Sequence, residues 1–272
     1  MKKDRAEKKK KWEIWVLRPV AWFIIWEIAE LIIGKKVPFA GPFDTAVQLY
    51  KDILDITFWR AIGNTFMGIS FGFVTALVLG TVLAYVAYYH KTFDGIFTPI
   101  MDFFRYIPMI TFTLLAILWS SSSALAWEVC LFLSIPTIYK NTLLGLNHSN
   151  RHTLMRIAQM DMPVMKKLNV MFNPAAMPDY IAGCHRALNM CWKSGIIAQF
   201  LGDTKHSIGS SLFVAKETGN VAQIFSWTIV IVLLSVLFEK VVIRILSMAA
   251  LNPKYASYDK VQEVLEEEDI QL

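Results

Sequence analysis

The sequence predicts an all-α polytopic membrane protein with six transmembrane helices, and three observations indicate this fold class. Hydrophobic residues make up 55% of the 272 residues and charged residues only 18%, and the mean hydropathy is +0.44, which is more apolar than an ordinary soluble domain. The chain contains 18 Phe and 9 Trp, and aromatic rings are typical of membrane interfaces. Six separate apolar segments follow one another, and at this hydropathy only helices satisfy their own backbone in lipid.

The chain opens with a basic segment, residues 1–11, in which seven residues are Lys or Arg. A solvated tail and a cytoplasmic anchor under the positive-inside rule both explain such a run. Residues 12–34 form the first expected span, with Glu27 and Glu30 on one helix face near its far end. A signal peptide is not expected, because this run contains the two carboxylates and lacks a small-residue cleavage site.

Residues 38–56 are expected to form an extracytoplasmic segment in which Thr45–Leu54 is a short amphipathic helix. Residues 57–248 form the core, and its first span carries a small residue at every fourth position, which predicts a face for close helix packing. Incidental glycine content is the alternative. The small residues are Gly68, Gly72, Ala76, Gly80 and Ala84, and the expected spans of the core are Gly63–Tyr89, Phe97–Trp119, Leu125–Tyr139, Tyr180–Gly202 and Val221–Met248. Residues 249–272 form a charged tail.

The segment from Arg151 to Pro178 is basic, of mixed polarity and rich in methionine, with six of the 12 methionines of the chain. A connecting loop with some core methionines is one interpretation. A surface that adapts to a moving partner is the other, because methionine is flexible and polarizable. Residues 151–160 and 162–172 are expected to form two short helices, which Asn173 and Pro174 end.

Six spans with the N-terminus inside place both termini and this segment in the cytoplasm, and the Lys and Arg bias agrees with that orientation. The chain has no GxxxxGK[ST] loop, no HExxH and no GxSxG. We therefore expect a chain that is not an enzyme and holds no cofactor or metal. The net charge of +5 comes largely from the N-terminal run, so no nucleic-acid partner is expected. The three cysteines lie in apolar segments and are interpreted as small hydrophobic residues.

The sequence resembles the inner-membrane permease subunits of binding-protein-dependent ABC importers of the nitrate, sulfonate, taurine and thiamine-precursor type. These permeases carry a cytoplasmic motif E-A-A-x3-G, followed about a dozen residues on by I-x-L-P. Counting back from Pro174, the Glu falls on Met155, the Gly on Asp161 and the Leu on Asn173. The layout is kept while those three residue types differ. The resemblance extends over roughly residues 38–248, through segments 57–80, 102–109, 175–192 and 208–212.

The resemblance implies a type I ABC importer (MetI-like) permease fold in the bacterial inner membrane. It implies a second copy of the chain, a separate ATPase dimer that holds ATP and Mg, and an extracytoplasmic binding protein. The region 151–172 would contain the coupling helix that docks on the ATPase. The residues assigned to ATPase coupling are Met155, Ala158, Met160, Asp161, Met162, Pro163, Met165, Asn173 and Pro174.

A translocation pathway is the second predicted site, and Lys193 is its leading residue. It lies well inside the fifth span, where ionisable groups usually face a bundle interior or a water cavity. Attraction of an anion and a structural ion pair with Glu128 explain it equally well. Gln199 occupies a place where such permeases often have Glu, and Trp192 has packing as its alternative. Arg105 and Arg186 complete the candidate set.

The function predicted from these observations is that of an importer permease for a small anionic or heterocyclic solute. The alternative is a secondary transporter or channel that works without an ATPase. Such carriers often show internal repeats or paired broken helices, which are not clear in this sequence. A membrane-embedded scaffold is a third and more distant interpretation.

Overall fold

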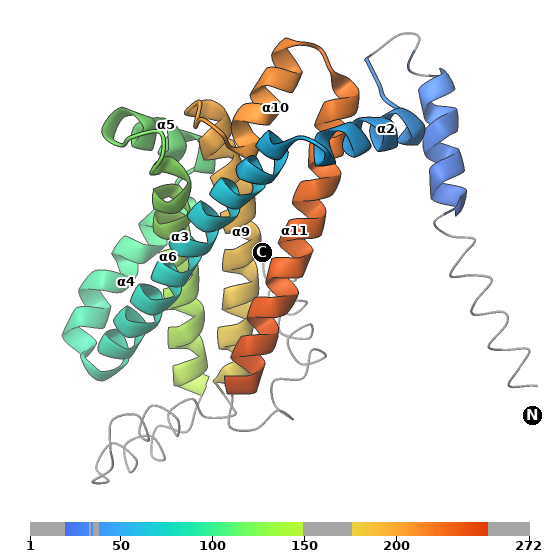
Figure 1. Cartoon of the computed structure of the whole chain (residues 1–272). Coiled ribbons are helices and arrows are strands. Elements are labelled where there is room, and N and C mark those ends of the chain that lie inside the picture. Colours follow the sequence, from blue (N-terminus) through green and yellow to red (C-terminus); the bar gives the residue numbers. More distant parts are fainter. Residues whose placement is uncertain (1–19, 33, 35–37, 149–175, 250–272) are drawn as a thin grey trace, which may run out of the picture. The chain divides into compact units, whose positions relative to one another are not determined.

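The computed structural model describes residues 20–32, 34, 38–148 and 176–249, and every regular element in these ranges is a helix. The predicted all-α class is confirmed for this part of the chain (Figure 1). Residues 20–32 are helical. The elements that follow are α2 (Pro42–Ile53), α3 (Ile56–Tyr89), α4 (Lys91–Tyr106), α5 (Met109–Trp119), α6 (Leu125–His148), α9 (Met177–Leu201), α10 (Ile208–Glu217) and α11 (Val221–Ala249).

The chain divides into two compact units. Unit 1 contains residues 1–61 and 211–232, and unit 2 contains residues 62–210 and 233–272. In unit 1, the indole N–H of Trp26 donates to the Ala40 carbonyl oxygen at 3.0 Å. The Trp26 and Phe39 rings both pack on Phe225, each with 5.5 Å between centroids. Helix 20–32, the segment before α2 and the first turns of α11 are therefore held together by aromatic contacts.

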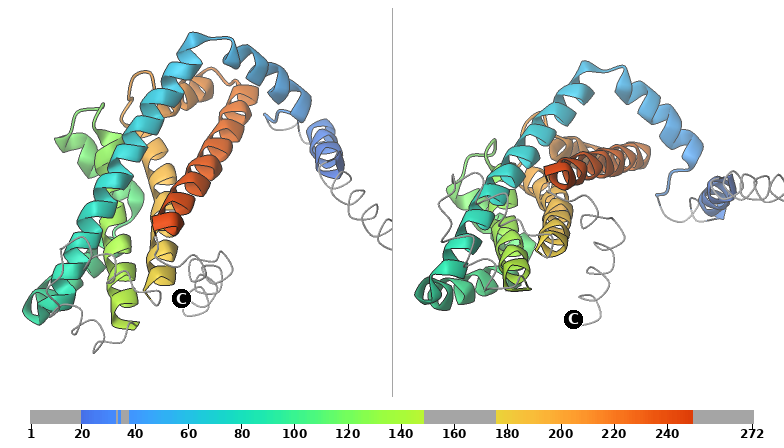
Figure 2. Two further views of the ribbon diagram at one scale, coloured as in Figure 1. Left: turned by 60° about the horizontal axis from the view of Figure 1, so that its bottom comes forward. Right: turned by 90° about the horizontal axis from the view of Figure 1, so that it is seen from below.

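Helices α6 and α9 lie side by side in unit 2, as the lime and yellow ribbons show in Figures 1 and 2. Glycines let their backbones approach. A Cβ added at Gly183 of α9 would lie 2.4 Å from the Asn141 Cβ of α6, and one at Gly145 of α6 would lie 2.6 Å from the carbonyl oxygen of Ala176. Contacts closer than 3.0 Å force a shift, so this pair packs closely only with glycine at these positions.

The predicted small-residue face of α3 is confirmed, and it packs on α6. A Cβ at Gly72 would lie 2.5 Å from the Trp127 carbonyl oxygen, and one at Gly80 would lie 3.0 Å from the Ile138 Cβ. Ala76 and Ala84 are fully buried. From Gly68 beside Ala126 to Gly80 beside Ile138, the residue numbers of the contacting positions rise along both helices. Helices α3 and α6 are therefore parallel.

The predicted third span, Phe97–Trp119, is not one continuous helix. The structure has α4 and α5 instead, bent by 100° at the break between them. Ile107 takes an extended conformation and Pro108 becomes the N-cap of α5. A proline ring disfavours helical geometry in the residue before it and supplies no N–H. Elsewhere the boundaries shift: α6 runs on beyond Tyr139 to His148, and the polar segment 203–220 contains α10.

Two helices of the described ranges are long and apolar enough to cross a membrane, Ile56–Tyr89 and Leu125–Asn147. The bent pair of α4 and α5 makes a third if the pair is one span. Helices α9 and α11 coincide with the predicted fifth and sixth spans. Of the first predicted span, residues 12–34, the structure describes residues 20–32, which are helical, and residue 34.

Candidate functional site

All nine residues predicted for ATPase coupling lie within 149–175, outside the residues that the structure describes. The structure does describe the two helices that flank this segment: α6 ends at His148 and α9 begins at Met177. Their facing ends are joined by polar contacts as well as by packing. Arg186 donates to the side-chain oxygen of Asn141, and the Asn141 amide donates to the Thr137 carbonyl oxygen at 2.7 Å. The segment 149–175 thus begins and ends on one closely packed pair of helices.

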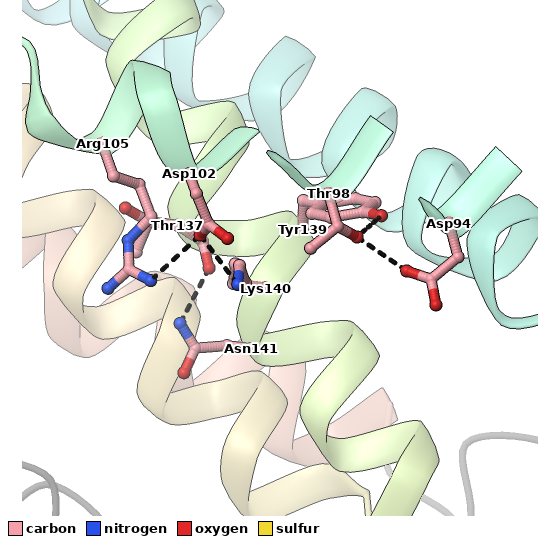
Figure 3. Close-up of polar contacts among 8 residues, drawn as sticks. All are labelled: Asp94, Thr98, Asp102, Arg105, Thr137, Tyr139, Lys140 and Asn141. Atoms are coloured by element: carbon pink, nitrogen blue, oxygen red, sulfur yellow. Dashed lines mark hydrogen bonds and ion pairs between the residues drawn. The ribbon is translucent and has the colours of Figure 1, made fainter. Parts of the chain in front are cut away.

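A polar seam joins α4 to α6 (Figure 3). The Lys140 ammonium lies 2.7 Å from the Asp102 carboxylate, and Arg105 lies 4.0 Å from the same carboxylate. One helical turn away, the Thr98 hydroxyl donates to Asp94 at 2.6 Å and is 2.8 Å from the Tyr139 hydroxyl. We call these six residues the α4–α6 polar seam. Arg105, a predicted pathway residue, therefore lies at the edge of an ion-pair cluster.

Lys193 is exposed on α9, although its neighbours Trp192 and Ser194 are buried. Glu128, its suggested partner, is half-buried, and no ion pair joins the two among the described residues. Arg186, two turns earlier on α9, is engaged by Asn141. Lys193 is thus an ammonium group on a largely buried helix.

Trp192 is buried, with 4% of its surface exposed. Its ring packs against those of Phe66 and Phe238, with centroid distances of 6.4 and 6.2 Å. Its indole N–H has no hydrogen-bond partner in the described part of the chain. The packing interpretation accounts for the ring, and the N–H is left with unused donor capacity.

Gln199 belongs to a buried network at the far end of α9. Its side-chain oxygen accepts from the Thr65 hydroxyl at 2.8 Å, and the Thr65 oxygen accepts from the Ile208 backbone N–H at 3.0 Å. Gln199 is 2% exposed and Thr65 is fully buried. The network holds α3, α9 and the first turn of α10 together within unit 2.

Two features of unit 2 were missed by the sequence reasoning. One is Thr65, because a threonine in a long apolar helix usually bonds within its own turn and carries no signal of a distant partner. The other is a polar contact between α9 and α11, in which His185 Nε2 lies 2.8 Å from the Glu239 carboxylate. Both residues interrupt apolar helices, which was a signal of internal pairing. The sequence around His185 or Glu239 does not indicate which residue is its partner.

The three cysteines are free and buried, as predicted for small hydrophobic residues. Cys130 donates to the Cys191 carbonyl oxygen at 3.1 Å across the α6–α9 contact. No group of three or more His, Cys, Asp or Glu side chains in the described ranges could hold a metal ion.

No protein-family model matches the chain. Two curated proteins are similar to it. The putative aliphatic sulfonates transport permease protein SsuC of Bacillus subtilis is 21% identical over 243 residues, which cover 85% of this chain and 84% of that protein. The taurine transport system permease protein TauC of Escherichia coli is 19% identical over 175 residues, covering 64% of this chain and 61% of that protein.

Both descriptions are those of transport proteins rather than enzymes. The first alignment covers most of both chains, so the similarity is not confined to one apolar segment. The candidate spans and these relatives together indicate a multi-pass membrane location. The resemblance to importer permeases is therefore confirmed: the chain is a distant relative of the transport permeases for aliphatic sulfonates and for taurine.

Proposed function

We propose that this chain is the membrane-spanning permease subunit of an ABC importer. It would form the translocation pathway for a small solute that a binding protein delivers, with transport driven by a separate ATPase subunit. The observation that carries the proposal is the similarity to a transport permease along 85% of the chain and 84% of that relative. In this assembly ATP and Mg belong to the ATPase, and two copies of the permease enclose the pathway.

We propose six crossings of a bacterial inner membrane, with both termini in the cytoplasm. Helices α3 and α6 and the bent pair α4–α5 supply three of them, and residues 12–34 supply the first. Helix α11 has 29 residues, or about 43 Å at 1.5 Å per residue, and no charged residue precedes Glu239 in it. A length of about 30 Å is enough for a bilayer core. Helix α9 carries more polar residues, which would find polar partners or water in the interior of the helix bundle.

The region 151–172, within segment 149–175, is the proposed coupling element, since the sequence has no GxxxxGK[ST] loop. Two observations support this role. The segment joins α6 to α9, so a displacement of it acts on both helices at once, and their packing through Gly145 and Gly183 leaves little room for separate movement. Its methionines offer flexible apolar contact to a partner surface that rotates.

The proposed substrate class is a small organic anion, with alkanesulfonates as the first compounds to test. The relatives are described as permeases for aliphatic sulfonates and for taurine. Lys193 is the pathway residue that would attract such an anion. It is exposed on α9 and forms no ion pair within the described ranges, so its charge is available.

The coupling role is tested by replacing Met160, Met162 and Met165 together by Asp, in the permease reconstituted with its ATPase and binding protein. Substrate-stimulated ATP hydrolysis should be lost, while the permease still elutes as a folded species. A triple replacement by Leu is the matched control and should keep most of the stimulation, because it preserves apolar contact. Unchanged stimulation in the Asp variant would contradict the assignment.

The pathway role is tested by Lys193→Met, which keeps the length of the side chain and removes its charge. Uptake of an alkanesulfonate into proteoliposomes should fall severalfold while assembly with the ATPase is unchanged. Lys205→Met, at an exposed position in the loop after α9, should transport normally. Normal uptake by Lys193→Met would reject this role, and uptake without ATP or the ATPase would instead support a secondary transporter.

A further inference from the structure

Helix α2 of unit 1 has its polar side turned inward. Thr45 is 1% exposed, and Gln48 and Asp52 are half-buried. These three residues follow one another at helical spacing on one face. Asp52 accepts a hydrogen bond from the Ser226 hydroxyl of α11 at 2.8 Å, and its other carboxylate oxygen accepts from the Gln48 amide at 2.8 Å. The inward face of α2 is therefore held to α11 by hydrogen bonds.

The outward face of α2 is apolar. Phe43, Val47, Tyr50 and Leu54 are spaced four, three and four residues apart, which aligns them along one side of the helix. They are 71%, 39%, 67% and 70% exposed. We call these four residues the α2 apolar stripe. A helix on the surface of a soluble domain has the opposite arrangement, with its apolar stripe toward the core.

The stripe continues into the start of a candidate membrane span. Helix α3 begins at Ile56, two residues after Leu54, and Ile56 and Trp59 are 78% and 54% exposed. The Trp59 indole N–H donates to the Ile53 carbonyl oxygen at 2.9 Å, which links the last turn of α2 to the first turn of α3. The apolar surface of α2 therefore lies next to the start of the span, and the exposed Asp55 stands between Leu54 and Ile56.

Residue types in this region are those of a membrane–water interface. Phe43, Tyr50 and Trp59 are aromatic, and Trp and Tyr concentrate at the level of the lipid headgroups. Asp44 and Lys51 are exposed as well, and they give α2 charged positions beside the stripe. A helix with an apolar stripe and charged positions outside it lies in the interfacial plane, with its apolar face about 5–10 Å into the boundary between headgroups and acyl chains.

We propose that α2 is a membrane-interface helix whose partner is the lipid bilayer itself. The α2 apolar stripe is buried in the leaflet that α3 enters first, while the inward face carries the hydrogen bonds to α11. Burial of apolar side chains away from water is favourable, so the stripe anchors the start of α3 at a defined depth. This role depends on a membrane location alone and not on the transport of any particular solute.

An open groove beside the stripe supports a lipid partner. It has a volume of about 390 Å³ and lies between helix 20–32 and α2 in unit 1. Its lining is apolar apart from one carboxylate and consists of Phe23, Ile24, Glu27, Pro42, Phe43 and Ala46. Because Phe43 belongs to both the groove and the stripe, acyl chains that cover the stripe also reach the groove.

Site-directed spin labelling of the full chain tests the proposal. The three buried cysteines are replaced by alanine, and single cysteines are introduced as Phe43→Cys, Tyr50→Cys and Leu54→Cys on the stripe. Asp44→Cys and Lys51→Cys are the matched controls on the same helix. Each labelled variant is reconstituted in vesicles of phosphatidylethanolamine and phosphatidylglycerol. Collisions with oxygen, which partitions into lipid, and with a water-soluble nickel chelate are then measured.

Labels on the stripe should collide severalfold more with oxygen than with the nickel chelate, and labels at the two controls should show the reverse ratio. A chelate accessibility on the stripe as high as at the controls would place it in water and overturn the proposal. Low collision rates with both reagents would show protein covering the stripe, which also overturns it. Loss of transport has no bearing on this readout, so the two proposals fail separately.

Discussion

At the scale of single residues, the contact between α3 and α6 depends on the absence of a Cβ atom in glycine. At Gly72 an added Cβ would lie 2.5 Å from the carbonyl oxygen of Trp127 and 2.7 Å from the Cβ of Cys130. The first of these is backbone and cannot rotate away. Gly63, on the same helix, has no heavy atom within 4 Å of an added Cβ. The two glycines therefore differ in surroundings and not in secondary structure.

This difference predicts opposite effects of the same substitution. Gly72→Ala should destabilise the protein by about 1–3 kcal/mol, because overpacking must push α3 away from α6. Gly63→Ala should be neutral or stabilising by up to about 1 kcal/mol, because alanine has the higher helix propensity. Thermal unfolding of the purified chain in detergent measures both. Equal midpoints for the two variants would contradict the α3–α6 packing.

Thr65 predicts a loss of a different kind, since its hydroxyl serves two buried groups. Thr65→Val keeps the shape but leaves the Gln199 oxygen and the Ile208 N–H without this partner. An unsatisfied buried polar group costs about 1–3 kcal/mol. Thr75→Val is the control on the same helix, because the Thr75 hydroxyl bonds only back to the Phe71 carbonyl oxygen. A destabilisation no larger than that of the control, measured by thermal unfolding, would remove Thr65 from the network.

At the scale of elements, the sequence predicted what depends on local pattern and missed what depends on a partner. The four-residue spacing of small side chains identified the packing face of α3 correctly, because a helix sets its own faces. The bend between α4 and α5 was missed although Pro108 was visible, because the hydropathy averaged over a stretch of apolar residues changes little when one of them is proline. The α4–α6 polar seam was missed because the charges of α4 do not specify which helix balances them.

The seam gives a prediction at this scale. Exchanging the charges of Asp102 and Lys140 should recover part of the stability that either single reversal loses, because the pair lies at 2.7 Å and is only about one third exposed on each side. A double-mutant cycle on thermal stability should give a coupling of about 1 kcal/mol or more. The Lys91–Asp94 pair on α4, at 3.8 Å and with Lys91 60% exposed, should couple far less. Equal coupling of the two pairs would contradict a structural role for the seam.

Asp55 gives a pH-dependent prediction at the start of α3. Its carboxylate accepts from the Thr57 backbone N–H at 2.9 Å, and this bond, with one from the Thr57 side chain, lowers the pKa of Asp55 below its ordinary value. A lowered pKa contributes stability above the ordinary pKa that is lost as the pH falls through the lowered one. Asp55→Ala should therefore be less stable than the parent at neutral pH, and the gap should narrow in acid. A stability difference between the two proteins that stays constant from neutral to acidic pH would argue against this role of the Asp55 carboxylate.

At the scale of the whole chain, the direction of α3 relative to α6 determines whether the bent pair α4–α5 crosses the membrane or forms a re-entrant loop. Gly68 meets Ala126, Gly72 meets Trp127 and Cys130, and Gly80 meets Ile138, so both helices run the same way within unit 2. The chain between them must therefore return along the bundle. A re-entrant loop of α4 and α5 would leave the end of α3 and the start of α6 on one side of the membrane, and parallel helices exclude that.

We therefore expect α4 and α5 to be one broken span, with the turn at His90 and the turn at Ser122 on opposite faces of the membrane. Both residues are exposed, so His90→Cys and Ser122→Cys, each made without the three native cysteines, report sidedness. A membrane-impermeant maleimide added to intact cells should label one of the two, and the other should react only after permeabilisation. Labelling of both in intact cells, or of neither, would mean that the bent pair is re-entrant and that the parallel contact of α3 with α6 is wrong. Helix α6 leads directly into segment 149–175, so the same labelling result shows on which face of the membrane this segment begins. With α3 and α6 parallel, that face is the one on which His90 lies. The proposed coupling to an ATPase requires this face to be the cytoplasmic one.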